Sequence, residues 1–207
     1  KPKYLRRINF KSKDNIWNAD LIIMPIDSGY KYILTILDGY TRYAFCVPLK
    51  DKKGLTIYNS FQKVIKDSKR TPDKLWVDQG KEFYNEHMYK LFKYKKSDVL
   101  EKENKEYKNK IYSVFNSSKN PIIERFNRTL TNKLWKNFTI NKSQKWLKLL
   151  PKIVKEYNNS IHRTINTTPK LASIYPSLVK IKYYNIINPE KPKFKINDRV
   201  RIFKYKN

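Results

Sequence analysis

Apolar residues gather along this chain in short runs that have two different spacings. The runs over 16–24, 30–37 and 44–49 are rich in β-branched and aromatic residues, which is typical of buried strands. The segment DGYTRY between the second and third runs carries an Asp-Gly turn signal. We therefore predict three consecutive strands that begin an antiparallel sheet.

The spacing changes after the third strand. Across 54–66 the apolar residues recur every three or four positions, as on one face of a helix: Leu55, Tyr58, Phe61 and Ile65. Pro72 then interrupts the chain before a short apolar run over 74–77. The predicted order is strand, strand, strand, helix, strand.

The second half of the chain is mainly helical in its pattern. We predict a helix over 85–92, a strand over 111–115, and an amphipathic helix from Pro121 to about Phe138, since proline is favoured at the first helical position. A further helix is predicted over 143–161, starting at a serine that can cap it. The fold class is α/β, with a mixed five-stranded sheet flanked by helices.

Changes in composition divide the chain into parts. We expect an N-terminal extension over 1–14, a core domain over 15–180, a proline-containing linker over 181–193, and over 194–207 the first strand of a small barrel whose remainder lies outside this sequence. Within the core domain, 93–110 is charged and poor in apolar residues, which favours an exposed insertion.

The charge balance indicates the class of partner. Lys and Arg number 46 against 18 Asp and Glu, a formal net charge of +28. A codon bias toward Lys, Asn, Ile and Tyr explains part of this surplus, but Asp and Glu also have AT-tolerant codons, so bias alone does not create it. We expect the partner to be a polyanion, and specifically nucleic acid.

Other site types are excluded or disfavoured by composition. Cys46 is the only cysteine, which excludes an internal disulfide, and His87 and His162 are too far apart to build a zinc module with it. No apolar run approaches 18 residues and no signal-peptide pattern is present, so we expect an unanchored, intracellular protein with no membrane partner. Because Lys1 is not an initiator methionine, we expect a fragment or a processed product.

Three carboxylates stand where a metal-dependent phosphoryl-transfer site would need them. Asp20 lies inside an apolar strand, Asp78 ends another, and Glu124 lies in the first turn of the helix that starts at Pro121. An acid in an apolar strand is costly to desolvate unless a cation or hydrogen bonds hold it. Two hard divalent cations about 3.5 to 4 Å apart would supply that stabilisation and could align an in-line attack on a phosphodiester.

Each acid also has a simpler interpretation. Asp20 could face water at a sheet edge, Asp78 could form a turn, and Glu124 could interact with the helix dipole. Asp38, which precedes a glycine, is expected to be a structural turn residue with at most a tuning role near a metal. Asp27 is expected at the surface or in a turn.

Polar and basic residues surround Glu124 on one side of its helix. Helical spacing groups Asn120, Asn127, Arg128 and Thr131 with it, and Lys119 precedes the helix. We predict that these five residues contact DNA phosphates, with an ordinary solvated basic helix as the alternative. Arg125 points about 100° away from Glu124, so it could brace the fold or a partner chain.

Four motifs follow one another in a familiar order. The segments WNAD, VDQGKEF, ERFNRTL and YNNSIHRTINTTPKLA resemble the retroviral-type (DDE, rve) integrase core over about residues 15 to 175. The segments TLTNKLWKNFT and FKINDRVRIFKYKN look most like integrases of Maverick/Polinton transposons and virophages. The resemblance implies an RNase H-like fold, the start of an SH3-like C-terminal barrel, and Asp20, Asp78 and Glu124 as catalytic and metal-binding residues.

The resemblance also implies an activity. A DNA integrase of this type uses two Mg²⁺ or Mn²⁺ ions to process donor DNA 3′ ends and join them to target DNA, and works as a homo-oligomer, dimer or tetramer, in the host nucleus or packaged with a mobile element or virus. Two alternatives stay open: an inactive DNA-binding relic, and an RNase H-like nuclease without joining activity. The chain departs from the family in its long spacer of 45 residues between Asp78 and Glu124.

Overall fold

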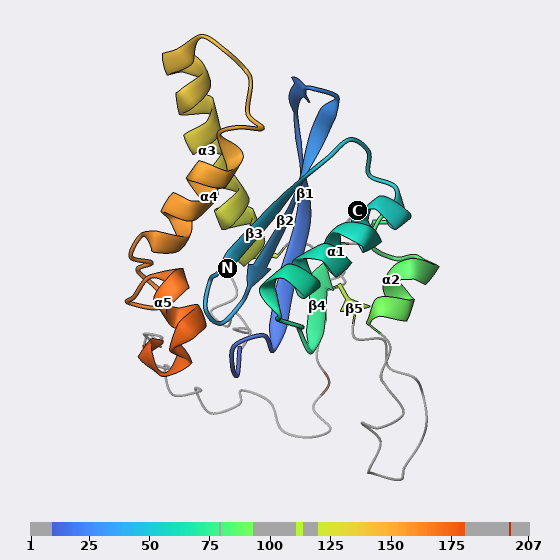
Figure 1. Cartoon of the computed structure of the whole chain (residues 1–207). Coiled ribbons are helices and arrows are strands. Elements are labelled where there is room, and N and C mark those ends of the chain that lie inside the picture. The colour runs from blue at the N-terminus through green and yellow to red at the C-terminus, as the bar shows by residue number, and fades with distance from the viewer. Residues whose placement is uncertain (1–9, 79, 93–110, 114–119, 181–198, 200–207) are drawn as a thin grey trace.

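The computed structural model describes residues 10–78, 80–92, 111–113, 120–180 and 199 (Figure 1). The predicted insertion, Lys119, the predicted linker from residue 181 on and all but residue 199 of the predicted barrel strand lie outside this described part. Within it, strands and helices alternate around one mixed sheet whose strand order is β3-β2-β1-β4-β5.

The sheet combines an antiparallel meander with a parallel half. β1 (Ile16–Asp27), β2 (Tyr30–Asp38) and β3 (Ala44–Leu49) pair antiparallel, whereas β4 (Lys74–Val77) pairs parallel with β1 and β5 (Ile111–Tyr112) pairs parallel with β4. The predicted mixed five-stranded sheet is confirmed. β1 is its central strand, so both halves of the sheet depend on it.

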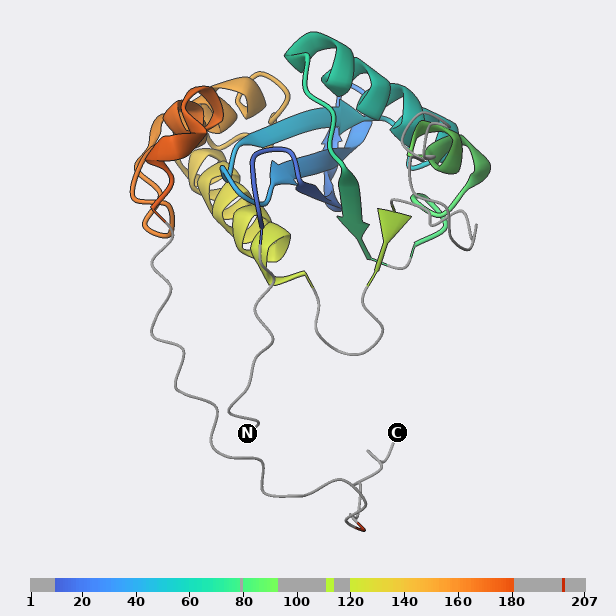
Figure 2. The same cartoon turned by 90° about the horizontal axis from the view of Figure 1, so that it is seen from below.

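Helices cover both faces of the sheet (Figure 2). α1 (Gly54–Ser68) and α2 (Glu86–Leu91) pack on one face, and α3 (Pro121–Asn141) and α4 (Leu150–Asn159) on the other. The chain continues into α5 (Pro169–Ile174) and a short 3-10 turn, η2 (Pro176–Leu178). No helix in the described ranges has both the length and the apolar character needed to cross a bilayer.

Strand alternation produces the two cores. On β2, Leu34 and Ile36 belong to the core under α1 and α2, whereas Ile33 and Leu37 belong to the core under α3 and α4. Successive residues of a strand point to opposite faces, so a continuous apolar run is required where both faces are covered. This explains why the first strands read as unbroken apolar segments.

One predicted helix is wrong at its start. Residues 143–146 have no regular secondary structure, residues 147–149 form a turn, and α4 begins only at Leu150, with Pro151 in its first turn. The carboxylate of Asp27 accepts the backbone N–H groups of Trp146 at 2.8 Å and Leu147 at 2.9 Å, and so holds this segment against the end of β1. Asp27 is therefore buried at the end of β1, directly before the turn at Ser28 and Gly29, so of the two predicted positions the surface one is wrong.

A buried ion-pair network joins the segment before β1, the end of β2 and the end of α1. Arg70 contacts the carboxylates of Asp14 and Asp38, each at 2.6 Å, and Thr41 donates a hydrogen bond to Asp38 at 2.6 Å. Three aromatic rings lie within cation–π distance of the Arg70 guanidinium: Trp17, Tyr43 and Phe45. The predicted structural role of Asp38 agrees with this geometry.

We predict that Arg70→Met lowers the free energy of unfolding by about 3 to 5 kcal/mol, because Asp38, which has no exposed surface, would lose its cation. Urea denaturation followed by circular dichroism measures this loss. The control is Lys90→Met, which breaks only the exposed pair with Glu86 and should cost about 0.5 kcal/mol or less. Equal losses in both variants would contradict a stabilising role for the network.

Candidate active site

The register of β1 and β4 places two of the candidate acids side by side. The last residue pair of this parallel ladder is Ala19 with Val77, and Asp20 and Asp78 are the next residues along the chain. Neighbouring strands lie about 4.8 Å apart, so the two acids sit at the same end of adjacent parallel strands. Asp20 is half-buried, whereas Asp78 is exposed where its strand ends.

Two asparagines of α3 connect this helix to the same stretch of β1. The Asn120 amide donates to the side-chain oxygen of Asn18 at 2.8 Å, and the Asn127 amide donates to Oδ2 of Asp20 at 2.7 Å. Asn18 and Asp20 are two residues apart and therefore share a face of β1. These two hydrogen bonds, which we call the asparagine ties, set the position of α3 across that face.

Glu124 lies between the asparagine ties on α3. It follows Asn120 by four residues and precedes Asn127 by three, so all three share one side of the helix. Its side chain is exposed, in the first turn, where an acid also interacts favourably with the helix dipole. The helix thus brings the third acid to the edge where Asp20 and Asp78 lie.

The electrostatics of Asp20 show that the three acids share one local field. The pKa of Asp20 is raised to about 6, mainly by burial and in addition by the negative charges of Asp78 and Glu124. Hydrogen bonds from the Leu21 N–H at 2.8 Å and from Asn127 act in the opposite direction. Asp20 is therefore a carboxylate held in place by two donors but short of positive charge.

The donor set fits a hard divalent cation, although the side chains do not form a ready-made cage. No group of three His, Cys, Asp or Glu side chains in the described segments is close enough to hold a metal ion as they stand. Carboxylate oxygens are the ligands that Mg²⁺ and Mn²⁺ prefer, and a cation would remove the cost of the crowded charges. Asp78 and Glu124 are exposed, so rotamer changes could close the site without moving the strands.

The residues predicted to contact DNA separate into different environments. Asn120 is 1% exposed, so it has no surface for a phosphate, and its predicted contact is replaced by a structural role. Asn127 is half-buried and holds Asp20. The hydroxyl of Thr131 donates to backbone carbonyls of α3, and Arg128 is exposed.

The sequence analysis grouped both asparagines with Glu124 but predicted that they contact DNA. Their partners on β1 lie 102 and 107 residues earlier in the chain, so no local sequence pattern indicates these contacts.

Comparison with known proteins agrees with this geometry. Residues 11–100, which contain Asp20 and Asp78, match the family model described as the integrase core domain, rve. The matched segment spans 90 of the 207 residues of the chain. The chain is also 31% identical over 192 residues to an uncharacterized transposon-derived protein of Caenorhabditis elegans, covering 85% of this chain and 56% of that protein. The chain therefore spans little more than half the length of this relative.

Two solved structures, of an integrase core and of an intasome, have a fold similar to that of this chain. The magnesium-bound catalytic core of human T-lymphotropic virus 2 (HTLV-2) integrase has a TM-score of 0.58 at 14% identity, over 78% of this chain and 97% of that one. An integrase of the simian T-cell lymphotropic virus intasome, solved with the PP2A regulatory subunit B56 gamma, has a TM-score of 0.65 at 16% identity, over 92% of this chain and 64% of that one. At such identities the similarity shows the RNase H-like fold alone.

We predict that the stability of the folded chain falls as the pH rises through the pKa of Asp20. The folded protein binds a proton at Asp20 up to about pH 6, whereas the unfolded chain releases it near the ordinary value of 3.8, so the folded state is penalised above that window. Asp20→Asn keeps the shape: its amide oxygen accepts the Leu21 N–H, and its amide NH2 can donate to Oδ1 of Asn127, which has no partner in the described ranges, once that amide flips. Without divalent metal it should gain about 1 to 3 kcal/mol over the native chain between pH 4 and 7.5.

Denaturant unfolding at several pH values measures this difference. Asp51→Asn is the control with the opposite sign, because hydrogen bonds from Thr56 and the Lys53 N–H lower the pKa of Asp51. The prediction fails if Asp20→Asn and the native chain have parallel pH profiles.

Proposed function

We propose that this chain is the catalytic core of a metal-dependent DNA integrase, which processes donor DNA 3′ ends and joins them to target DNA by in-line transesterification. The observation that carries the proposal is the position of Asp20, next to Asp78 in register and held by α3, the helix that carries Glu124. The integrase core match and the fold support the same conclusion.

The chain's own side chains have distinct parts in this chemistry. Asp20, Asp78 and Glu124 are proposed as the ligands of two Mg²⁺ or Mn²⁺ ions. Bound divalent ions activate a water or a DNA 3′ hydroxyl and stabilise charge on the leaving oxygen. The Leu21 N–H and the Asn127 amide fix the orientation of the Asp20 carboxylate, so that its geometry is set before substrate arrives.

Direct displacement by water or by a DNA hydroxyl needs no nucleophilic side chain, which fits the properties of the cysteine and of the histidine near α4. Cys46 is a poor candidate nucleophile because burial raises the pKa of its thiol far above the ordinary value. His162 lies near the end of α4, where its Nδ1 accepts the Thr164 N–H at 3.3 Å. Neither Cys46 nor His162 is therefore suited to form a covalent intermediate with DNA.

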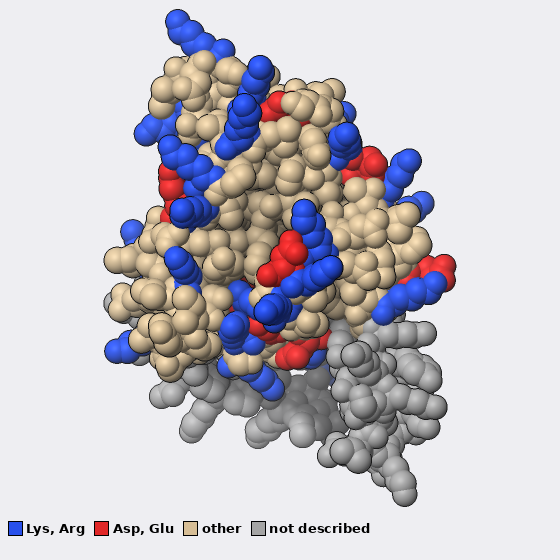
Figure 3. All heavy atoms as spheres, in the orientation of Figure 1, with Lys and Arg blue, Asp and Glu red and all other residues tan. Residues whose placement is uncertain are grey.

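The proposed substrate is DNA, and the surface charge supports it. Lys and Arg are spread over the face shown in Figure 3, with fewer acids between them, and the net charge of the whole chain is +28. Exposed Arg128 lies one residue after Asn127 and is proposed to contact a backbone phosphate close to the acids. A homo-oligomer on DNA is proposed by analogy with the simian T-cell lymphotropic virus intasome.

A finer origin is also proposed. The segments that resemble Maverick/Polinton and virophage integrases, together with the transposon-derived relative, support a mobile-element integrase that acts in the host nucleus or travels with the element.

We predict that Asp20→Asn, Asp78→Asn and Glu124→Gln each reduce metal-dependent DNA joining by at least about a thousandfold, because each removes an anionic ligand and keeps the shape. A strand-transfer assay with labelled donor ends measures it, and exposed Asp73→Asn is the control. Cleavage without joining in the native chain would favour a nuclease. Metal-dependent DNA binding with neither reaction would favour an inactive relic.

DNA affinity should fall steeply with salt and depend little on sequence, because lysines and arginines that neutralise phosphates release counterions. Fluorescence anisotropy with two unrelated duplexes between about 50 and 200 mM salt measures the slope, and six phosphate contacts would give a loss of roughly a thousandfold. A DNA affinity that does not change with salt would contradict binding through phosphate neutralisation.

A further inference from the structure

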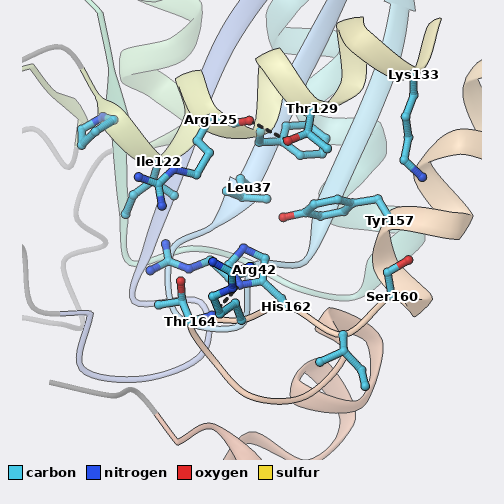
Figure 4. Close-up of a pocket in the computed structure, with 14 residues that line it drawn as sticks. Leu37, Arg42, Ile122, Arg125, Thr129, Lys133, Tyr157, Ser160, His162 and Thr164 are labelled. Carbon is cyan, nitrogen blue, oxygen red and sulfur yellow. Dashed lines mark hydrogen bonds between the residues drawn. The ribbon is translucent and has the colours of Figure 1, made fainter. Parts of the chain in front are cut away.

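A second concave surface lies on the side of α3 that is turned away from the acids. A pocket of about 500 Å³ opens between the first half of α3, the end of α4 and the turn after β2 (Figure 4). Arg125 projects into it from α3, Tyr157 from α4, and Arg42 from the turn after β2. Arg125 is next to Glu124 in the chain, but the two point about 100° apart around the helix.

Arg42 is the unusual member of this pocket. Its side chain is 8% exposed, and its Nη1 atom is buried without a hydrogen-bond partner in the described ranges. The guanidinium lies 5.3 Å from the ring centroid of Phe10, a contact that offers Nη1 no hydrogen-bond acceptor. A buried unpaired donor, above all a charged one, costs free energy comparable to a lost hydrogen bond, so a native structure that keeps one needs a reason.

The backbone of Arg42 adds a second cost. Its φ of 61° lies in the left-handed region, which non-glycine residues adopt at the expense of strain. The Arg42 N–H donates to the Asp38 carbonyl at 2.9 Å, which ties this turn to the buried ion-pair network. The structure therefore holds a desolvated cation in a costly conformation, aimed into a pocket.

The charges around Arg42 are predominantly positive. Arg125, Arg163 and Lys133 also line the pocket, and no acidic residue does. Lys133 is engaged by Glu156 at 3.5 Å, whereas Arg125 and Arg163 have no ion pair within the described part of the chain. The pKa of Arg42 is lowered to about 10, mainly by burial, and the positive charge of Arg125 acts in the same direction. Burial and the same two arginines lower the pKa of His162 to about 4, which keeps it neutral.

We propose that this pocket binds a phosphate oxyanion between Arg42 and Arg125. A phosphate would supply the acceptor that the Nη1 atom of Arg42 lacks and would neutralise the repulsion between the two guanidinium groups, and guanidinium forks match phosphate geometry. Two hydroxyls of the pocket are committed to the backbone, since Thr129 donates to the Arg125 carbonyl and Ser160 to the Glu156 carbonyl. The hydroxyls of Tyr157 and Thr164 also line the pocket, but they carry no charge to complement a phosphate. The arginines are therefore the recognising groups.

The phosphate can come from two sources, a DNA backbone or a small phosphate compound. The first source rests on the proposed function, because the pocket would then hold DNA that approaches α3 on the side opposite the acids. The second is independent of it.

The test measures binding of two probes, inorganic pyrophosphate and a short DNA duplex, in EDTA so that the acids contribute no metal-dependent binding. The variants are Arg42→Gln and the exposed Arg125→Gln, which is expected to fold even if loss of Arg42 destabilises the turn. The matched control is Lys136→Gln, an exposed cation of α3 that lies eleven residues from Arg125 on the same face but outside the pocket.

Pyrophosphate should raise the melting temperature of the native chain, and Arg125→Gln should weaken its affinity about tenfold or more, against about twofold or less for Lys136→Gln. If pyrophosphate also competes with DNA and Arg125→Gln weakens DNA binding to a similar degree, the source is DNA. If DNA binding is unchanged and no competition occurs, the source is a small phosphate compound. Equal effects of Arg125→Gln and Lys136→Gln on both probes would overturn the phosphate site. Asp20→Asn should retain pyrophosphate binding, so failure of the catalytic proposal is detected separately.

Discussion

The hydrogen bond from the Asn127 amide to the Asp20 carboxylate, 2.7 Å long, is the interaction on which the candidate active site depends. β1 and β4 alone would bring together two acids, because their parallel register fixes Asp20 beside Asp78. The third acid comes from a helix far along the chain, and only a contact between α3 and β1 can give it a defined place. The second tie, from Asn120 to Asn18, prevents the helix from rotating about the first.

The same constraint gives α3 two different sides. The apolar residues Phe126, Leu130 and Leu134 bury the helix against the sheet, so the remaining directions are fixed once the asparagine ties form. Glu124 then faces the acids, while Arg125, one residue later, faces the pocket that contains Arg42. The Arg42 N–H donates to the carbonyl of Asp38, and the Asp38 carboxylate pairs with Arg70. The pocket is therefore joined to the end of β2 and to the buried ion-pair network. An acidic and a basic site thus lie on opposite flanks of one helix.

Much of the sheet could be predicted from the sequence because each strand is a separate apolar run with its own turn signals. β3 and β4 have the predicted bounds, and the neighbouring positions of Asp20 and Asp78 follow once both strands are parallel. The errors arise where a single polar side chain acts over a long distance. The apolar spacing predicted a helix that includes residues 146 and 147, but Asp27 binds the backbone N–H groups of both residues and holds them outside α4. Asn120 lies in a polar stretch of sequence, yet it is buried and donates a hydrogen bond to Asn18. Neither partner is close in sequence, so no local pattern contains the information.

The central claim is that Asp20, Asp78 and Glu124 act together as ligands of divalent cations. Anomalous diffraction from crystals soaked in Mn²⁺ tests it most directly, since it locates the ions without depending on activity. We expect a strong anomalous peak between the carboxylates of Asp20 and Asp78, with Glu124 rotated toward it. The hydrogen bond from Asn127 to Asp20 should be retained. An absence of density there at saturating Mn²⁺, or a peak only at other acids of the chain, would contradict it.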